Sequence, residues 1–203
     1  MPDAVISATA VPASGGPAPV PGSTREPRPA GWRELSSDEE LTELLGPPHP
    51  IVIDKVHDEL TEDDLGVLAR SPFCVLSTSD AEGNCDSSPR GDTMGFVHVL
   101  DARTVALPDR PGNRRGDSLR NILVNPRVGL LHLVPGGADV LRVNGRARIL
   151  TDAPFFDAMA VDGRRPQLAV VVEIDEIFRH CPASLRRAGL WQPDTWPRDV
   201  PRG

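Results

Sequence analysis

The sequence predicts an α+β protein built on a mainly antiparallel split β-barrel with peripheral helices. Between residues 73 and 176 it contains six or seven short apolar or alternating segments separated by turn residues. Few helical segments interrupt them, and strands and helices do not alternate as they do in doubly wound folds. Consecutive strands joined by short turns therefore favour a barrel-based antiparallel architecture.

The composition of the chain changes at about residue 30. Residues 1–30 are rich in Pro, Ala, Gly and Ser, and such a segment buries too little apolar surface to offset the entropy lost on ordering. We therefore expect a disordered tail at residues 1–30. The remaining residues, 31–203, are expected to form one domain with a C-terminal helical extension.

Two helices are predicted ahead of the strands. A serine pair precedes "DEELTELL", and Gly46 ends that helix. Thr61 and Asp64 have the spacing of a capping box at the start of the second helix, which stops before Pro72. Between the two helices, the short apolar segment 51–54 ("IVID") is expected to be a strand.

The other elements follow as hairpins and short helices. Strands are predicted from alternation or from short apolar runs bounded by turns, at residues 73–79, 85–91, 95–101, 102–108, 127–135, 140–150 and 167–176. Helices are predicted at residues 117–125, 153–161 and 182–191.

Composition and charge disfavour several classes of function. The formal net charge is −7, so the broad basic surface of a general nucleic-acid binder is not expected. No segment approaches the ~20 apolar residues of a membrane span, and no secretory signal is visible. The 3 cysteines are widely spaced, without a CxxC motif or a Cys/His cluster, so no metal site or disulfide framework is expected. A cytoplasmic protein fits these features best.

One basic turn, "DRPGNRRGDSLRNI", lies in this acidic chain. Asn113, Arg114 and Arg115 precede a helix that Asp117 or Ser118 can cap, and a helix N-terminus is itself an anion site. Guanidinium groups hold phosphate oxygens bidentately. The turn therefore indicates either a site for a phosphomonoester or a solvated arginine-rich turn paired with surplus carboxylates.

Three stretches resemble the pyridoxamine 5′-phosphate oxidase-like flavoproteins, which have the FMN-binding split-barrel fold. They are "CVLSTSDAEGNCDSSPRGD", "TVALPDRPGNRRGDSLRNILVNPRVGLLHLVPG" and "LRVNGRARIL". The likeness is greatest to an uncharacterised actinobacterial-type branch and covers roughly residues 30–196. Its most specific motif, "NRRGDSLRNILVNPRVGLL", joins phosphate-site arginines to a helix, an Asn-Pro pair and a strand.

The resemblance, with the chemistry of the basic turn, implies an FMN site. The residues assigned to it are Ser88, Arg90, Leu107, Pro108, Asp109, Asn113, Arg114, Arg115, Ser118, Arg142, Asn144 and Trp191. Arg90 matches a strand-end arginine that contacts the FMN phosphate or ribityl chain. Residues 107–109 match a strand end that lies along the edge of the isoalloxazine ring.

By the same resemblance, the other positions are expected to bind the phosphate of the cofactor or to face its ring. The Asn-Arg-Arg element matches a phosphate-holding element whose third member is usually lysine, here Arg115. Arg142 and Asn144 fall on a strand face that should look toward the flavin. In this family the site lies across a homodimer interface, so a second subunit would complete it. Trp191 would then contact the flavin or pack at the dimer seam.

The resemblance implies a cofactor more clearly than a reaction. The C-terminal "WQPDTWPRDVPRG" does not match the Arg-Leu-x-Pro segment that holds the substrate phosphate in the true oxidase. The expected function is an FMN-dependent oxidoreductase acting on a small molecule, with no catalytic side chain singled out. Alternatives are a non-catalytic flavin sensor or carrier and a deazaflavin-dependent reductase. Relatives of the fold also bind haem, for which His98, His132 and His180 are available.

Overall fold

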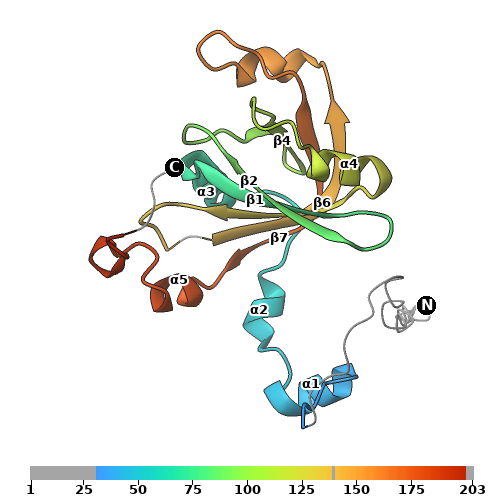
Figure 1. Ribbon diagram of the computed structural model, residues 1–203, viewed down its shortest axis with the longest axis vertical. Helices are drawn as coiled ribbons and strands as arrows, with labels where there is room; N and C mark the ends of the chain where they lie inside the picture. The colour runs from blue at the N-terminus through green and yellow to red at the C-terminus, as the bar shows by residue number, and fades with distance from the viewer. Residues whose placement is uncertain (1–30, 139, 200–203) are drawn as a thin grey trace, which may run out of the picture. The chain divides into compact units, whose positions relative to one another are not determined.

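The structure is a computed structural model that describes residues 31–138 and 140–199 (Figure 1). The chain forms two compact units, Met1–Leu45 and Gly46–Gly203. In the described part of the first unit, the predicted helix is confirmed as α1 (Asp38–Leu45). The disordered tail expected at residues 1–30 lies outside the described residues.

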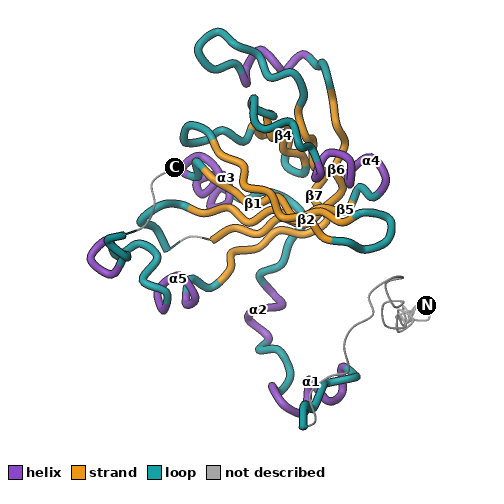
Figure 2. Tube along the Cα trace, viewed as in Figure 1, coloured by secondary structure: helices purple, strands orange, loops and turns teal. Residues whose placement is uncertain are grey.

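The second unit is built on an open antiparallel sheet (Figure 2). In its described part, seven strands are ordered β2-β1-β5-β6-β7-β4-β3. They are β1 (Phe73–Ser79), β2 (Cys85–Gly91), β3 (His98–Asp101), β4 (Thr104–Pro108), β5 (Arg127–Leu133), β6 (Val140–Leu150) and β7 (Ala169–His180). The order ends at β2 and β3, so the sheet is not closed. The prediction of an α+β split-barrel fold is confirmed.

The prediction of a strand at residues 51–54 is wrong, because this segment lies in the helix α2 (Pro50–Asp54). Pro50 is its first residue, where the fixed φ of proline suits a helix and its missing N–H is not needed. A four-residue apolar run does not by itself distinguish a helix from a strand.

The helix α3 (Glu62–Arg70) begins at the predicted capping box. The Thr61 hydroxyl accepts a hydrogen bond from Asp64 N–H at 3.3 Å, and Asp64 Oδ2 accepts one from Thr61 N–H at 3.0 Å. His57 contacts the same carboxylate through Nε2 at 2.7 Å, and its Nδ1 lies 2.9 Å from the Lys55 carbonyl. Burial alone would lower the pKa of His57, but these two acceptors outweigh it and raise that pKa. The segment before α3 is thus fixed to the helix N-terminus.

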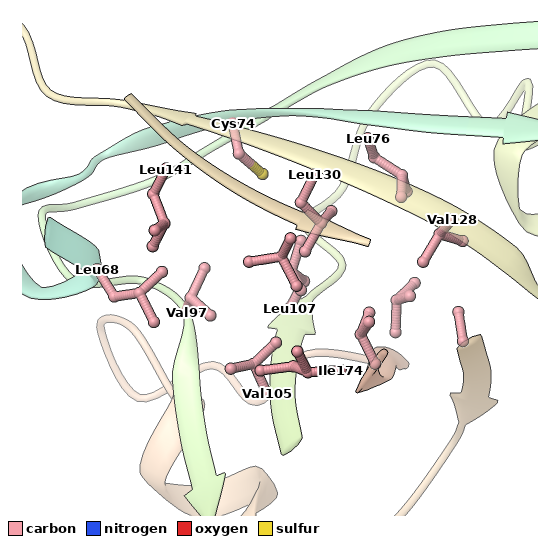
Figure 3. Close-up of a cluster of buried hydrophobic side chains, with 14 of the residues drawn as sticks. Leu68, Cys74, Leu76, Val97, Val105, Leu107, Val128, Leu130, Leu141 and Ile174 are labelled. Atoms are coloured by element: carbon pink, nitrogen blue, oxygen red, sulfur yellow. The ribbon is translucent and has the colours of Figure 1, made fainter. Parts of the chain in front are cut away.

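The main core lies among the inward-facing side chains of the strands (Figure 3). Val67 and Leu68 of α3 and Ile122 of α4 (Asp117–Val124) pack against it. The inward-facing strand residues include Cys74, Leu76, Val105, Leu107, Val128, Leu130, Leu141, Val143 and Ile174. The helices α3 and α4 cover this face of the sheet. Because successive side chains of a strand point to opposite faces, the residues that alternate with the core residues lie on the other face.

The remaining helical segments are shorter than predicted. The 3₁₀-helix η1 (Pro154–Met159) buries Phe156 in a second, smaller cluster. After β7 come α5 (Ala183–Arg187) and the 3₁₀-helix η2 (Pro193–Thr195). Across residues 31–138 and 140–199, no helix has the length and apolar character needed to cross a membrane.

Candidate functional site

Three polar side chains follow one another along the inward face of β2. Asp86, Ser88 and Arg90 are half-buried, and their exposed neighbours alternate with them. Opposite them on β1 lie buried residues, with Cys74 facing Arg90 and Thr78 facing Asp86. Since directly paired residues share a face, these three side chains lie on the core face, at the edge strand of the sheet.

Two contacts fix the basic segment 109–118 to this row. Arg90 Nη1 donates to Asp109 Oδ1 at 2.6 Å, and Ser118 Oγ donates to Asp86 Oδ2 at 2.5 Å. Arg90 and Asp86 are four residues apart on one strand, which corresponds to about 13 Å. Both ends of the segment are therefore held along the part of β2 that carries Ser88.

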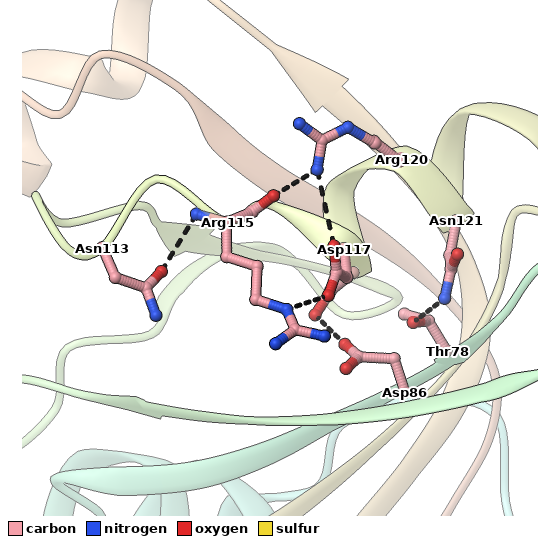
Figure 4. A network of polar contacts seen from close by, with 8 residues as sticks. Thr78, Asp86, Asn113, Arg115, Asp117, Arg120 and Asn121 are labelled. Carbon is pink, nitrogen blue, oxygen red and sulfur yellow. Dashed lines mark hydrogen bonds and ion pairs between the residues drawn. The ribbon is translucent and has the colours of Figure 1, made fainter.

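The turn before α4 differs from the predicted one in its cap (Figure 4). Gly116 occupies the N-cap position with φ 68°, and no side chain caps the helix. The prediction that Asp117 or Ser118 caps α4 is wrong, because Asp117 binds arginines and Ser118 binds Asp86. The first N–H groups of α4 consequently have no side-chain cap and are available to an anion.

The arginines of the turn have different partners. Arg115 Nε and Arg120 Nη1 both contact the Asp117 carboxylate, and Arg115 N–H donates to Asn113 Oδ1 at 3.0 Å (Figure 4). Arg114 is exposed with φ 59°, and no ion pair is found for it among the residues that the structure describes. Arg114 is thus the guanidinium of this turn that a ligand could take without breaking an ion pair.

Arg110 anchors the segment. Its Nε donates to the Asp92 carboxylate, and its Nη2 donates to the Met159 carbonyl at 2.8 Å. This half-buried side chain therefore holds the segment against η1, and its charge is paired within the chain.

Leu107 and Pro108 are the last two residues of β4. The Leu107 side chain is buried in the main core. The first residue of β3, His98, pairs with Ala106, so Leu107 and Pro108 extend past the end of that neighbouring strand. On the side of β4 that faces β3, the main chain of these two residues is therefore not covered by β3.

Arg142 and Asn144 lie on the other side of the sheet, which we call the outer face. They alternate along β6 with the buried Leu141 and Val143. A groove of about 450 Å³ runs along this face. It is lined by Ser77, Gly129, Leu130, Leu131, Leu133, Val140, Arg142, Asn144, His180, Ser184 and Leu185.

Trp191 lies next to this groove. It lines a hollow of about 190 Å³ beside α5, and Leu185 lines both the hollow and the groove. Its Nε1 is buried without a hydrogen-bond partner among the described residues. The indole therefore has a free donor on the side of the molecule that carries Arg142.

The predicted site residues thus form two groups. Nine of them gather along β2, the end of β4 and the segment that leads into α4. Arg142, Asn144 and Trp191 form the other group, and β2 and β6 are separated by β1 and β5, which corresponds to about 14 Å. The two groups also lie on opposite faces of the sheet, so a ligand lying along β2 on the core face does not contact Arg142 or Asn144 of the same chain. Sequence reasoning missed Asp86, although its spacing from Ser88 and Arg90 along β2 could have identified it.

The histidines considered for haem lie apart. His98 stacks on Phe155 with ring centroids 5.9 Å apart, and His180 lines the outer groove. His132 is fully buried beside Cys74, and neither of its ring nitrogens has a partner in the described structure. Burial raises the pKa of the Cys74 thiol to about 12, so this cysteine is not a nucleophile at neutral pH.

Replacing Arg90 by alanine is expected to lower the free energy of unfolding by about 2 kcal/mol. The half-buried Asp109 carboxylate would lose its guanidinium partner. Chemical denaturation measures the effect. The double variant Arg90→Ala, Asp109→Ala should recover part of the loss, because no carboxylate is then left unpaired. Strictly additive losses would show that the ion pair does not hold the segment.

The open antiparallel sheet of seven described strands, with a few helices packed against it, defines a split-barrel α+β protein. The family model described as pyridoxamine 5′-phosphate oxidase matches residues 60–181. The match spans more than half of the chain, so the chain belongs to the pyridoxamine 5′-phosphate oxidase family.

Several solved structures have a similar arrangement of elements. HupZ from Group A Streptococcus is 16% identical, with a TM-score of 0.48 over 59% of this chain and 93% of that one. An FMN-binding protein from Syntrophomonas wolfei is 14% identical, with a TM-score of 0.45 over 70% and 92%. General Stress Protein 26 from Bacillus anthracis is 18% identical, with a TM-score of 0.43 over 58% and 91%. No curated protein matches the chain.

Proposed function

We propose that this chain binds FMN and acts as an FMN-dependent oxidoreductase on a small molecule. The observation that carries the proposal is the basic segment 109–118, held along Ser88 by Asp86 and Arg90. Two donors there lack partners in the described structure, the buried Arg90 Nε and the uncapped N-terminus of α4. Unpartnered donors at both ends of one segment suit a ligand that carries a phosphate at one end and acceptors at the other.

The residues present fit the parts of FMN. Arg114, Arg115 and the α4 N-terminus would hold the dianionic phosphate, for which Arg115 would share or release Asp117. Ser88 would donate to the ribityl chain. Arg90 and the main chain of residues 107–109 would face the ring. The roughly 13 Å between the two anchor points suits an extended ligand lying along β2.

The chain's own part in the chemistry is orientation and electrostatics. Bound FMN would supply hydride transfer at its ring. Arg90 would stabilise negative charge that develops on the ring when it is reduced, because a preorganised donor acts strongly in a partly buried site. No described side chain is required as a general acid or base in this scheme.

The site would be completed by a second copy of the chain. Arg142, Asn144 and Trp191 lie on the outer face, where they do not meet a ligand held by Arg114 of the same chain. In a homodimer, the outer face of one subunit would meet the flavin of its partner. This arrangement would use both groups of residues and cover the partly exposed Leu131 and Leu133 of the outer face.

The protein is expected to purify yellow, as a dimer with one FMN per chain. Absorption of the purified protein, followed by heat release and chromatography of the cofactor, measures identity and amount. Sedimentation of the loaded protein measures its mass. A colourless protein that does not bind added FMN in a titration would overturn the cofactor proposal. A protein that binds FMN as a monomer would overturn the shared site.

Turnover is tested on the same sample. Anaerobic addition of NADH or NADPH should bleach the flavin bands if the protein is an FMN-dependent oxidoreductase. A stably bound flavin that accepts electrons from neither donor would indicate a flavin carrier or sensor. Binding of deazaflavin in preference to FMN would indicate a deazaflavin-dependent reductase.

A further inference from the structure

The outer groove contains a half-buried cation without a counter-ion. The Arg142 guanidinium lies 4.9 Å from the centroid of the Phe178 ring. No carboxylate pairs with it among the residues that the structure describes. Of the arginines described, Arg90 and Arg110 are the others that are half-buried, and each binds an aspartate. Burying an unpaired charge is costly, so Arg142 points to an anion that is not part of the described chain.

The lining of the groove indicates what kind of anion fits. None of the lining residues is acidic, and the nearby Glu176 accepts a hydrogen bond from Asn144 Nδ2. His180 and Ser184 add two side chains that are able to form hydrogen bonds with a ligand. The apolar side chains on the outer face of this lining are Leu131, Leu133, Val140 and Leu185, whereas the Leu130 side chain points into the core. A volume of about 450 Å³ lies within the usual range for small-molecule sites.

We propose that this groove binds a small organic carboxylate with an apolar body, and that Arg142 is its counter-ion. A single guanidinium compensates one negative charge, and its planar donors match a carboxylate bidentately. The contact with the Phe178 ring restrains the position of the guanidinium, which helps to preorganise its donors. The apolar side chains then bury the body of the ligand.

The inference rests on the proposed function, in which the outer face meets the partner's flavin, and it names the substrate class of that site. A substrate held by Arg142 would place its apolar body between the groove wall and the flavin of the partner. The competing occupant is an acidic side chain of the second copy, which would neutralise Arg142 at the interface instead.

Binding of benzoate, benzamide and inorganic phosphate to the full chain tests the proposal. Calorimetric titrations use the FMN-loaded protein and the same protein after flavin removal. Benzoate should bind about tenfold or more tightly than benzamide, which has the same shape without the charge. Arg142→Gln should abolish that preference. The matched control Arg148→Gln removes an exposed arginine of the same strand that pairs with Glu173, and it should keep the preference.

Three outcomes overturn the proposal. Equal affinity for benzoate and benzamide would show that charge is not recognised. Tighter binding of inorganic phosphate than of benzoate, lost in Arg142→Gln, would show that the ligand is a phosphate. Unchanged benzoate binding together with a weaker dimer in Arg142→Gln would assign Arg142 to the partner subunit. Because flavin content is measured separately, loss of FMN binding with benzoate binding intact would refute the proposed function alone.

Discussion

Replacing Arg114 and Arg115 together by alanine will weaken FMN binding by about a hundredfold or more, if the basic segment holds the phosphate. Charge-assisted hydrogen bonds to a phosphate are among the strongest polar contacts in proteins, and two would be lost. Arg114 has no ion pair in the described structure, so its charge is available to the ligand. Fluorescence titration of the flavin-free protein with FMN measures the change.

The matched control for this variant is Arg120→Ala. Arg120 contacts the same Asp117 carboxylate as Arg115 but belongs to the first turns of α4. Its loss should leave FMN affinity within about threefold of the parent, because it faces the Asp117 side chain and the Arg115 carbonyl. All three arginines are exposed, so unfolding midpoints should change little. Equal loss of affinity in the double variant and in Arg120→Ala would mean that general positive charge, not a clamp, attracts FMN.

Stability will fall by about 3 kcal/mol between pH 6.5 and pH 4 through His132 alone. Burial lowers the pKa of His132 to about 4, whereas an unfolded histidine titrates near 6.5. The folded state therefore holds the ring neutral while the unfolded state gains a proton. The contribution of His132 to stability is complete above pH 6.5 and is lost as the pH falls toward 4.

The variant His132→Leu isolates this effect. Leucine is apolar and of similar size, and neither ring nitrogen has a partner to lose in the described structure. At neutral pH the variant should be as stable as the parent or more stable, and its unfolding free energy should depend less on pH below 6.5. Urea denaturation at several pH values measures both. The control His180→Gln removes an exposed histidine, and parallel pH profiles for the parent and His132→Leu would contradict the prediction.

Local signals predicted most elements of the fold. The hairpins were found because alternation and turn residues lie within a few positions of one another, as between β1 and β2. The capping box at Thr61 was found for the same reason. The strand expected at residues 51–54 failed because four apolar residues after Pro50 suit either structure. The cap of α4 failed because the Ser118 hydroxyl binds a carboxylate from a distant strand.

The sequence by itself determined the family resemblance, the strand order along the chain and the basic segment that precedes α4. Those features depend on residue types at short spacings. Only the tertiary structure decided that Arg90 and Arg142 lie on opposite faces of the sheet, and that Arg142 has no counter-ion among the described residues. Both results depend on the strand order, in which β2 and β6 flank β1 and β5, and on pairing between residues far apart in the chain. The alternation along β6 indicated that Arg142 and Leu141 face opposite ways. It did not indicate which strands would flank them, because pairing between distant strands is not a local property.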